Sequence, residues 1–185
     1  MKGIIFTEFT EMVESVFGFD TLDTIIERAN LPSGGQYTAV GTYDHGEMVS
    51  LVIQLSAATG MEVPALLKAF GTHLFHRFAK IYPDMIAGES SALGFLDRVE
   101  THIHREVLKL YPNAELPRFE NHWVTDRELE MVYHSNKHFE DVAEGLILGC
   151  LEHFNETAEV TRIPGDSADG GVLFRVRLAA DAAAV

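Results

Sequence analysis

The sequence predicts an α+β fold, with helices over its first 110 residues and antiparallel strands plus one further helix after them. Two patterns predict this order. Apolar side chains recur at three- and four-residue steps in the first part, as on amphipathic helices, and alternate with polar ones in parts of the second, as on strands. With 185 residues the chain can bury a substantial core. We therefore expect one domain over residues 1–178, followed by a frayed tail over residues 179–185.

Turn residues bound the predicted helices. The first apolar stripe ends at Gly18, and a later one ends at Gly60. Pro64 suits the first turn of the next helix, where its missing N–H leaves no hydrogen bond unmade. We expect helices over residues 2–18, 20–30, 45–59, 63–81, 91–110 and 139–154.

Two hairpins are predicted in the last third of the chain, because β-prone segments there flank short runs of turn residues. The first turn is Thr125-Asp126-Arg127, and the second is the glycine-rich run 164–171. The strands are expected over residues 119–124 and 129–133, and over residues 158–163 and 172–178.

Composition narrows the class of protein. The hydrophobic fraction of 46% and the charged fraction of 23% are ordinary for a soluble globular protein. No apolar run has the length of a membrane span, and Glu8 and Glu11 interrupt any signal-peptide core. We therefore expect a cytoplasmic protein without a membrane partner. A net charge of −14, with no local basic patch, argues against nucleic acid as a partner.

The single cysteine, Cys150, excludes an intramolecular disulfide and a zinc site of several cysteines. Its neighbours in the sequence are largely apolar, so we expect a buried thiol. Nine histidines still raise the question of another metal site. His73 and His76 lie three residues apart on a predicted helix, a spacing that can chelate, but no third ligand is near them in the sequence.

Helix geometry separates His102 from His104. His102 has charged residues at the neighbouring helical positions and should face water. His104 has apolar or aromatic residues three, four and seven positions later, so it should lie at the edge of the buried stripe. These residues are Val107, Leu108 and Tyr111. Only His104 is placed to enter a pocket, and its spacing leaves open whether it binds a ligand or is a structural histidine.

Several motifs occur in a set order along the chain, and together they resemble the H-NOX (haem-nitric oxide/oxygen binding) family. The resemblance covers residues 1–178. The matching segments are Met1-Lys2-Gly3-Ile4, His104 to Phe119 with Pro117, Tyr133-x-Ser135 and Glu144-Gly145-Leu146. The family is related to the sensor domain of soluble guanylate cyclase, and stand-alone members occur in bacteria. The resemblance implies an N-terminal helical lobe and a C-terminal lobe of antiparallel sheet and helix, with haem between them.

The same resemblance implies roles for individual residues. His104 would be the proximal ligand of a ferrous haem b (iron protoporphyrin IX). The hydroxyls of Tyr133 and Ser135 would bind the haem propionates. The family motif ends in arginine, where this chain has Lys137. The flexible ammonium group of lysine therefore replaces the planar guanidinium of arginine, which can form two parallel hydrogen bonds to a carboxylate. Pro117 matches a proline that presses on the haem, although a simple structural turn explains it equally well.

The distal positions implied by the alignment are all apolar. They are Ile5, Phe9, Leu74, Phe78, Val142 and Leu146. Oxygen-binding members have a tyrosine hydroxyl at the position of Val142. Without such a donor, bound oxygen loses a charge-assisted hydrogen bond of roughly 1.5–3 kcal/mol, or about ten- to a hundredfold in affinity. Nitric oxide needs no donor.

We therefore expect a non-enzymatic sensor that binds nitric oxide, with carbon monoxide as a second candidate ligand. As the family implies, NO would weaken the bond to His104 and shift the two lobes. Because no kinase or cyclase segment is present, the output would pass to a separate sensor histidine kinase or cyclic di-GMP enzyme. Two other hypotheses remain: a haem carrier or storage protein, and a metal-dependent hydrolase at His73/His76 or His102/His104, which lacks a third ligand.

Overall fold

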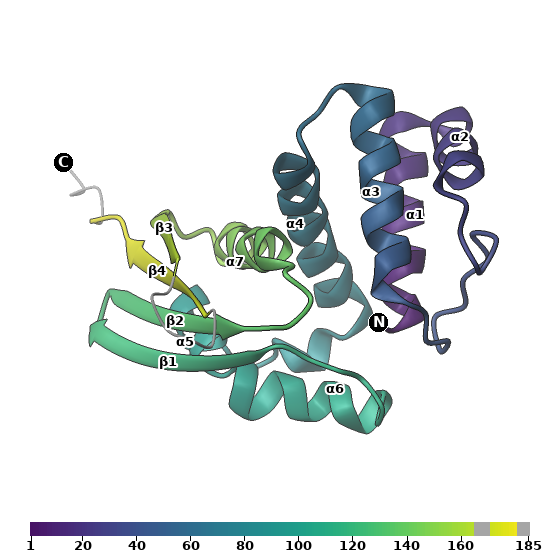
Figure 1. The fold of residues 1–185 in the computed structure, drawn as a ribbon. Coiled ribbons are helices and arrows are strands. Elements are labelled where there is room, and N and C mark those ends of the chain that lie inside the picture. Colours follow the sequence, from purple (N-terminus) through teal and green to yellow (C-terminus); the bar gives the residue numbers. More distant parts are fainter. Residues whose placement is uncertain (165–170, 181–185) are drawn as a thin grey trace.

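A computed structural model describes residues 1–164 and 171–180 and has two lobes (Figure 1). Helices α1 to α4 form one lobe, and the other combines a four-stranded sheet with α5, α6 and α7. The elements are α1 (Gly3–Phe17), α2 (Phe19–Ala29), α3 (His45–Thr59), α4 (Val63–Ile81), α5 (Ala92–Asp97), α6 (His104–Leu110), β1 (Arg118–Thr125), β2 (Glu128–His134), α7 (Glu140–His153), β3 (Ala158–Pro164) and β4 (Val172–Leu178). The predicted α+β class and the two lobes are confirmed.

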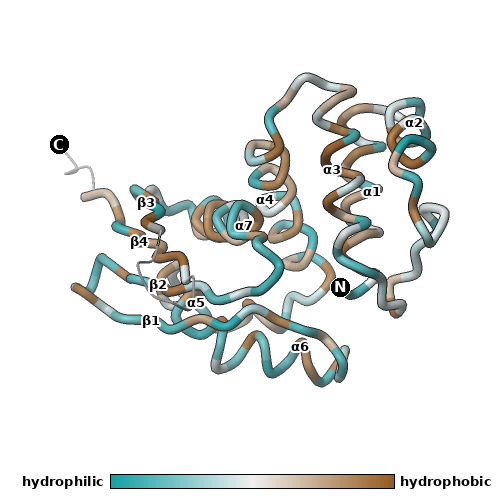
Figure 2. Tube along the Cα trace, in the orientation of Figure 1, coloured by the Kyte–Doolittle hydropathy of each residue, from teal (hydrophilic) through white to brown (hydrophobic). Residues whose placement is uncertain are grey.

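The first four helices begin and end within a residue or so of their predicted bounds. Gly60 ends α3 in a left-handed conformation with φ of 73°, and Pro64 lies in the first turn of α4. Their hydrophobic residues concentrate along α1, α3 and α4 (Figure 2) and bury one core. Among the described residues, no single helix is both long and apolar enough to cross a membrane; α3 and α4 pass that test only as a pair, bent by 113°.

The sheet has the strand order β1-β2-β4-β3, and all neighbouring strands are antiparallel. Both predicted hairpins are confirmed, β1 with β2 and β3 with β4. On β2, Leu129, Met131 and Tyr133 alternate with more exposed residues and are buried in a second core that includes part of α7. Tyr133, the last of the three, lies opposite Phe119 of β1.

Helix α7 packs along α4 and joins the two lobes. The two backbones touch at paired glycines. A Cβ atom on Gly145 would lie 2.1 Å from the Lys68 carbonyl oxygen, and one on Gly71 would lie 2.2 Å from that of Val142. Only glycine allows this approach. Leu146, the next residue on α7, packs against both cores, so α7 is in contact with both lobes.

The prediction of one continuous helix over residues 91–110 is wrong. The chain forms α5, then a π-helical turn (Val99–Ile103), and only then α6. At the break Arg98 has ψ near 0°, and its carbonyl accepts from the N–H groups of both His102 and Ile103. A π-turn adds a residue to one helical turn and so changes which side chains share a face. Within α6 itself, Val107 lines a cavity, as does Tyr111 directly after the helix, whereas Leu108 is 40% exposed, so the expectation that Leu108 lies on the buried stripe is wrong.

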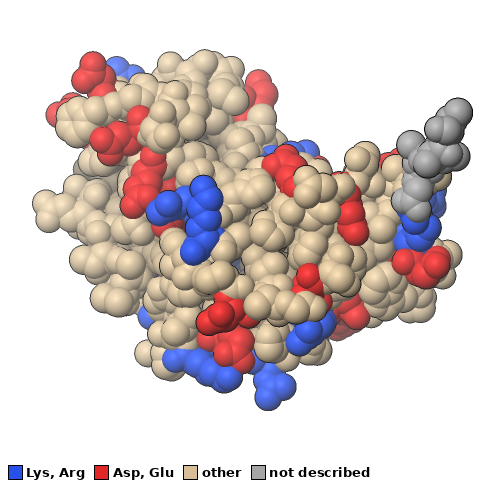
Figure 3. All heavy atoms as spheres, turned by 180° about the vertical axis from the view of Figure 1, so that it is seen from behind, with Lys and Arg blue, Asp and Glu red and all other residues tan. Residues whose placement is uncertain are grey.

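Parts of two predictions lie outside the described residues: most of the second hairpin turn, at 165–170, and the end of the tail, at 181–185. At the start of that tail the Ala179 N–H donates to the Thr157 carbonyl at 2.8 Å. On the face drawn in Figure 3, acidic and basic side chains lie beside one another, with neutral surface between the groups.

Candidate functional site

A cavity of about 740 Å³ lies where the two lobes meet. It is bounded by α1 and α4 of the helical lobe, by α7, by β2, and by the segment from α5 to the start of β1. Most of the lining side chains are apolar. Its volume falls in the range of roughly 300–1,000 Å³ that is typical of sites for small molecules and cofactors.

His104 is the first residue of α6 and lines this cavity with a side chain that is 14% exposed. Its Nδ1 lies 3.1 Å from Oε2 of Glu100, and its ring centroid is 5.9 Å from that of Phe119. Pro117, in the turn between α6 and β1, lines the same cavity. Within the described part of the chain, no hydrogen bond engages Nε2 of His104. This nitrogen is therefore available to a ligand.

Burial lowers the pKa of the His104 imidazole below its usual value, and the nearby Glu100 carboxylate partly opposes this shift. The ring is therefore neutral at physiological pH. A metal ion requires the neutral imidazole, because only that form has a free lone pair on one nitrogen. His102 does not line the cavity, which agrees with the choice of His104 from helix geometry.

The end of β2 and the segment that follows it bring three predicted residues, Tyr133, Ser135 and Lys137, to the cavity. Burial raises the pKa of the Tyr133 phenol, with partial opposition from its hydrogen bond with Ser135, so the hydroxyl keeps its proton and can donate. Ser135 Oγ accepts from the Lys137 N–H at 3.2 Å. Lys137 Nζ forms an ion pair of 2.6 Å with Glu115 Oε2. These three groups can hold an anion. However, Lys137 is the only charged side chain among them, and an anion would have to compete with Glu115 for it.

Five of the six predicted distal residues line the cavity: Ile5, Leu74, Phe78, Val142 and Leu146. The sixth, Phe9, does not. Its ring is fully buried in the helical core, with its centroid 5.2 Å from that of Phe70 in an edge-to-face contact. Phe9 therefore supports the wall from behind. The five residues that line this wall carry no polar side-chain group.

Three features of the site were missed in the sequence. Glu100 lies four residues before His104, a spacing that could have indicated the contact. Tyr82 and Tyr111 follow α4 and α6, line the cavity and have hydroxyl oxygens 3.1 Å apart. Burial and this contact raise the pKa of Tyr82 to about 12. The contact between these two hydroxyls depends on the tertiary fold, so no local sequence pattern could have predicted it. Arg118 also lines the cavity.

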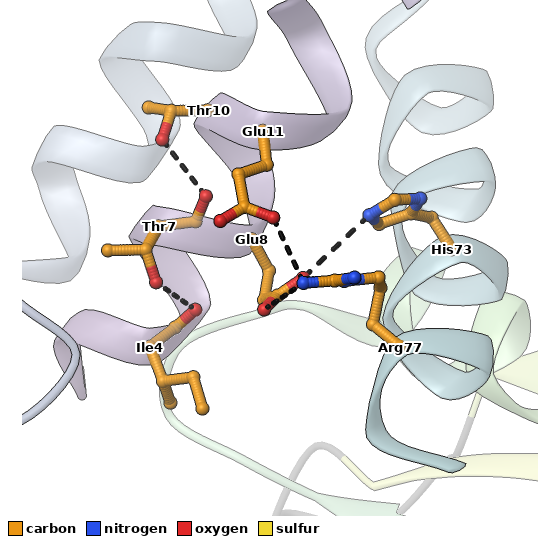
Figure 4. Close-up of polar contacts among 7 residues, drawn as sticks. All are labelled: Ile4, Thr7, Glu8, Thr10, Glu11, His73 and Arg77. Atoms are coloured by element: carbon orange, nitrogen blue, oxygen red, sulfur yellow. Dashed lines mark hydrogen bonds and ion pairs between the residues drawn. The ribbon is translucent and has the colours of Figure 1, made fainter. Parts of the chain in front are cut away.

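The structure does not assemble a metal site from His73 and His76. His76 pairs with Glu152, and His73 Nε2 lies 3.9 Å from Glu8 in a cluster between α1 and α4 (Figure 4). There Arg77 donates to both oxygens of the buried Glu8, at 2.6 and 3.3 Å. No group of three or more potential ligands from His, Cys, Asp and Glu occurs within residues 1–164 and 171–180. The cluster joins two helices.

The cavity suits a large, mostly apolar cofactor with one metal atom and an anionic edge. An apolar slot accepts the body of such a group. His104 offers one unengaged nitrogen, which is the ligand that haem iron takes from a protein. Hydroxyls and a cation near the end of β2 suit carboxylates. The residues that line the cavity therefore fit haem b.

Comparisons with known proteins agree with this chemistry. Residues 2–162 match the model of a family described as Haem-NO-binding. A search of curated proteins found no match.

Solved structures resemble the chain over almost its full length. The Fe(II) unliganded H-NOX protein of K. algicida is 37% identical, with 100% of both chains covered and a TM-score of 0.92. The IWP-051-bound H-NOX of Shewanella woodyi in the Fe(II)CO state is 37% identical over 100% of this chain and 97% of that one, with a TM-score of 0.84. An H-NOX protein of S. oneidensis in the Fe(II)NO state is 24% identical, covers 97% and 100%, and has a TM-score of 0.88, which shows a shared fold.

Proposed function

The chain belongs to the Haem-NO-binding (H-NOX) family, and from this premise we propose that it is a nitric oxide sensor with His104 as its iron ligand. Members of this family bind haem and act as gas-sensor domains that are not themselves enzymes. Relatives have structures with iron in the Fe(II) state, bound to NO or CO. Selectivity for NO, the role of each residue and the output are our proposals for this chain. So is its place in a bacterial cytoplasm.

One observation carries the proposal: His104, whose Nδ1 is held by Glu100 and whose Nε2 is unengaged within the described residues, lines a mostly apolar cavity that five apolar side chains of the distal wall also line. His104 is the only histidine besides His134 among the lining residues that the structure describes, and its Nδ1 is already bound to Glu100. When bound, ferrous haem supplies the open coordination position for a gas. His104, at the start of α6, would hold the iron through Nε2.

The polar groups at and after the end of β2 would orient the cofactor. Tyr133 and Ser135 would donate hydrogen bonds to the propionates, and Lys137 would supply a positive charge. Because Lys137 is paired with Glu115 in this structure, it would exchange the Glu115 carboxylate for a propionate when haem binds. A Lys ammonium suits that exchange, since it acts as a mobile point charge.

The distal wall selects NO over oxygen. Bound oxygen carries partial negative charge and gains from a hydrogen-bond donor, which Val142 and its neighbours lack. Carbon monoxide, which also depends little on a donor, remains a second ligand. The same wall excludes water from the gas site because its side chains are apolar.

A movement of His104 can be transmitted to the helical lobe through α6 and two tyrosines. The ligand begins α6, the same helix ends at Tyr111, and the Tyr111 hydroxyl contacts that of Tyr82 directly after α4. A shift of α6 therefore acts on the end of α4. We propose that the resulting change between the lobes is read by a separate effector, a sensor histidine kinase or a cyclic di-GMP enzyme.

A second function, haem carriage or storage without signalling, is favoured by the pair of Lys137 and Glu115. A propionate clamp whose cation is already paired holds its anion less firmly. Such a carrier would bind haem but would discriminate little between gases.

The test is the absorption spectrum of the reduced protein before and after NO, together with the variant His104→Gly. We expect a Soret band, a change on adding NO and no stable complex in air. Haem binding should be lost in His104→Gly and restored by added imidazole. His102→Gly is the matched control, because His102 lies two residues away and does not line the cavity.

Each outcome separates the hypotheses. Absence of a Soret band rejects haem binding, and a stable oxygen complex rejects selectivity for NO. Unchanged haem content in His104→Gly rejects the ligand assignment. Similar affinities for all three gases favour the carrier.

A further inference from the structure

Glu100 is the acidic side chain in contact with His104. Its Oε2 lies 3.1 Å from His104 Nδ1 and accepts the backbone N–H of Phe119, also at 3.1 Å. A carboxylate has no proton to donate, so Nδ1 must be the donor in the first contact. The lone pair of the imidazole therefore lies on Nε2, the nitrogen left for a metal.

The local backbone holds Glu100 in this position. It lies in the π-helical turn, where the backbone N–H of His104 donates to the carbonyl of Val99. The Phe119 backbone N–H, at the start of β1, donates to the same carboxylate oxygen. The π-helical turn that carries Glu100 and the start of β1, nineteen residues later, therefore together hold Oε2 of Glu100 beside the imidazole.

The acceptor is a charged group, and this changes the imidazole. A metal-binding histidine that donates its second N–H to a carboxylate becomes a more basic ligand. The Glu100 side chain is 36% exposed, so water screens part of its charge, while the His104 side chain is 14% exposed. The oxygen in question is engaged by two N–H donors, which hold it in place.

We propose that Glu100 is a positioning residue that strengthens the bond between His104 Nε2 and the iron, and so sets how readily NO displaces His104. The inference rests on the proposed function, because it requires His104 to be the ligand. Glu100 does not touch the cofactor in this account. It acts through the imidazole, by fixing the tautomer and by raising the basicity of the donor nitrogen.

The test uses the haem-loaded, reduced full chain and the variants Glu100→Gln and Glu100→Ala. Glutamine keeps an acceptor oxygen for Phe119 and Nδ1 but removes the charge, whereas alanine removes both. Glu106→Gln is the matched control, since Glu106 pairs with Lys109 and does not line the cavity. The main readout is the iron–histidine stretching vibration of the unliganded protein by resonance Raman spectroscopy.

We expect this vibration to move to lower frequency in Glu100→Gln and further in Glu100→Ala, and to stay in place in Glu106→Gln. Losing an outer-shell partner typically costs about ten- to a hundredfold in metal affinity. We therefore expect the rate at which NO displaces His104 from the iron, followed by stopped-flow absorption, to rise by a factor of that order in Glu100→Ala. The stretching frequency reports the bond itself, so a purely structural role for Glu100 would leave it unchanged in Glu100→Gln.

The two proposals fail in different ways. If the wild-type protein has no iron–histidine band, the proposed ligand is wrong and the inference falls with it. If the wild-type band is present and Glu100→Gln leaves it unshifted, only the role of Glu100 is wrong. Glutamine is close in shape to glutamate, so this variant keeps the test decisive even if Glu100→Ala does not fold.

Discussion

Replacing Val142 with tyrosine should give the protein an oxygen complex. Val142 is on α7 and lines the cavity beside other apolar residues of the distal wall. The backbones of α7 and α4 pack closely beside it, since the Val142 carbonyl oxygen would lie 2.2 Å from a Cβ atom placed on Gly71. A larger side chain at this position must therefore extend into the cavity, toward the proposed gas site.

The size of the effect follows from this apolar setting. The phenol would donate to the partial negative charge on bound oxygen with no other polar side chain of that wall competing for it. Such a charge-assisted hydrogen bond contributes about 1.5–3 kcal/mol, which corresponds to about ten- to a hundredfold in oxygen affinity. The larger ring also overpacks the wall, and this should lower stability by roughly 1–3 kcal/mol.

Val142→Phe is the matched control, because it adds nearly the same ring without the hydroxyl. Oxygen affinity of the reduced proteins would be measured by absorption titration, and stability by urea unfolding. The ratio of oxygen affinities between the two variants isolates the hydrogen bond. Equal oxygen affinities, in variants that bind CO normally, would refute the reasoning.

Three further predictions concern packing and charge. Gly145→Ala should lower the free energy of unfolding by about 2 kcal/mol or more in urea titrations, because the new Cβ meets a backbone oxygen at 2.1 Å. Arg77→Met should lower it by about 3 kcal/mol, since the buried Glu8 loses its cation; this is the low end for a buried pair because Arg77 is 35% exposed. Cys150 should resist iodoacetamide at pH 8 in the native protein and react in denaturant, because burial raises the pKa of its thiol.

Each of these has a control or a contrary result. Gly46→Ala is the control for Gly145, since its Cβ would meet only the flexible side chain of Asp44. Glu11→Gln removes an exposed partner of Arg77 and should change stability little. Rapid alkylation of Cys150 in the folded protein would show that its surroundings open easily.

The stability contributed by Cys150 has a defined pH window. Its folded-state pKa is raised, so the neutral thiol is favoured in the fold. The contribution is therefore complete below the pKa of the unfolded thiol, roughly 8.5, and is lost as pH rises above it. Stability measured between pH 7 and pH 10 should fall in this direction.

Much of the fold was predictable because it depends on local patterns. The bounds of α3 and α4 follow from apolar spacing together with Gly60 and Pro64, and the β1–β2 hairpin follows from alternation. The break near Arg98 was missed. The residues on either side of it favour a helix, and a π-turn differs from an α-turn by a single residue.

The site was less predictable. Spacing placed His104 near a pocket, but its assignment as an iron ligand came from the resemblance and stays a proposal. The contact of Glu100 with His104 could have been predicted from their four-residue spacing, whereas the contact of Tyr82 with Tyr111 could not. Phe9, expected at the distal wall, belongs to the layer behind it, because alignment gives the helix face and not the depth of a side chain.

By itself the sequence determined the order of helices and strands, the buried thiol and the choice of His104 over His102 as the pocket-facing residue, because each depends on neighbours within a turn or a strand. The tertiary structure alone decided the cavity, the contact of Glu100 with Phe119, and the pairing of Lys137 with Glu115. These depend on where segments far apart in the chain come together. Side-chain packing and backbone approach at α4 and α7 fix that arrangement, and no local pattern encodes it.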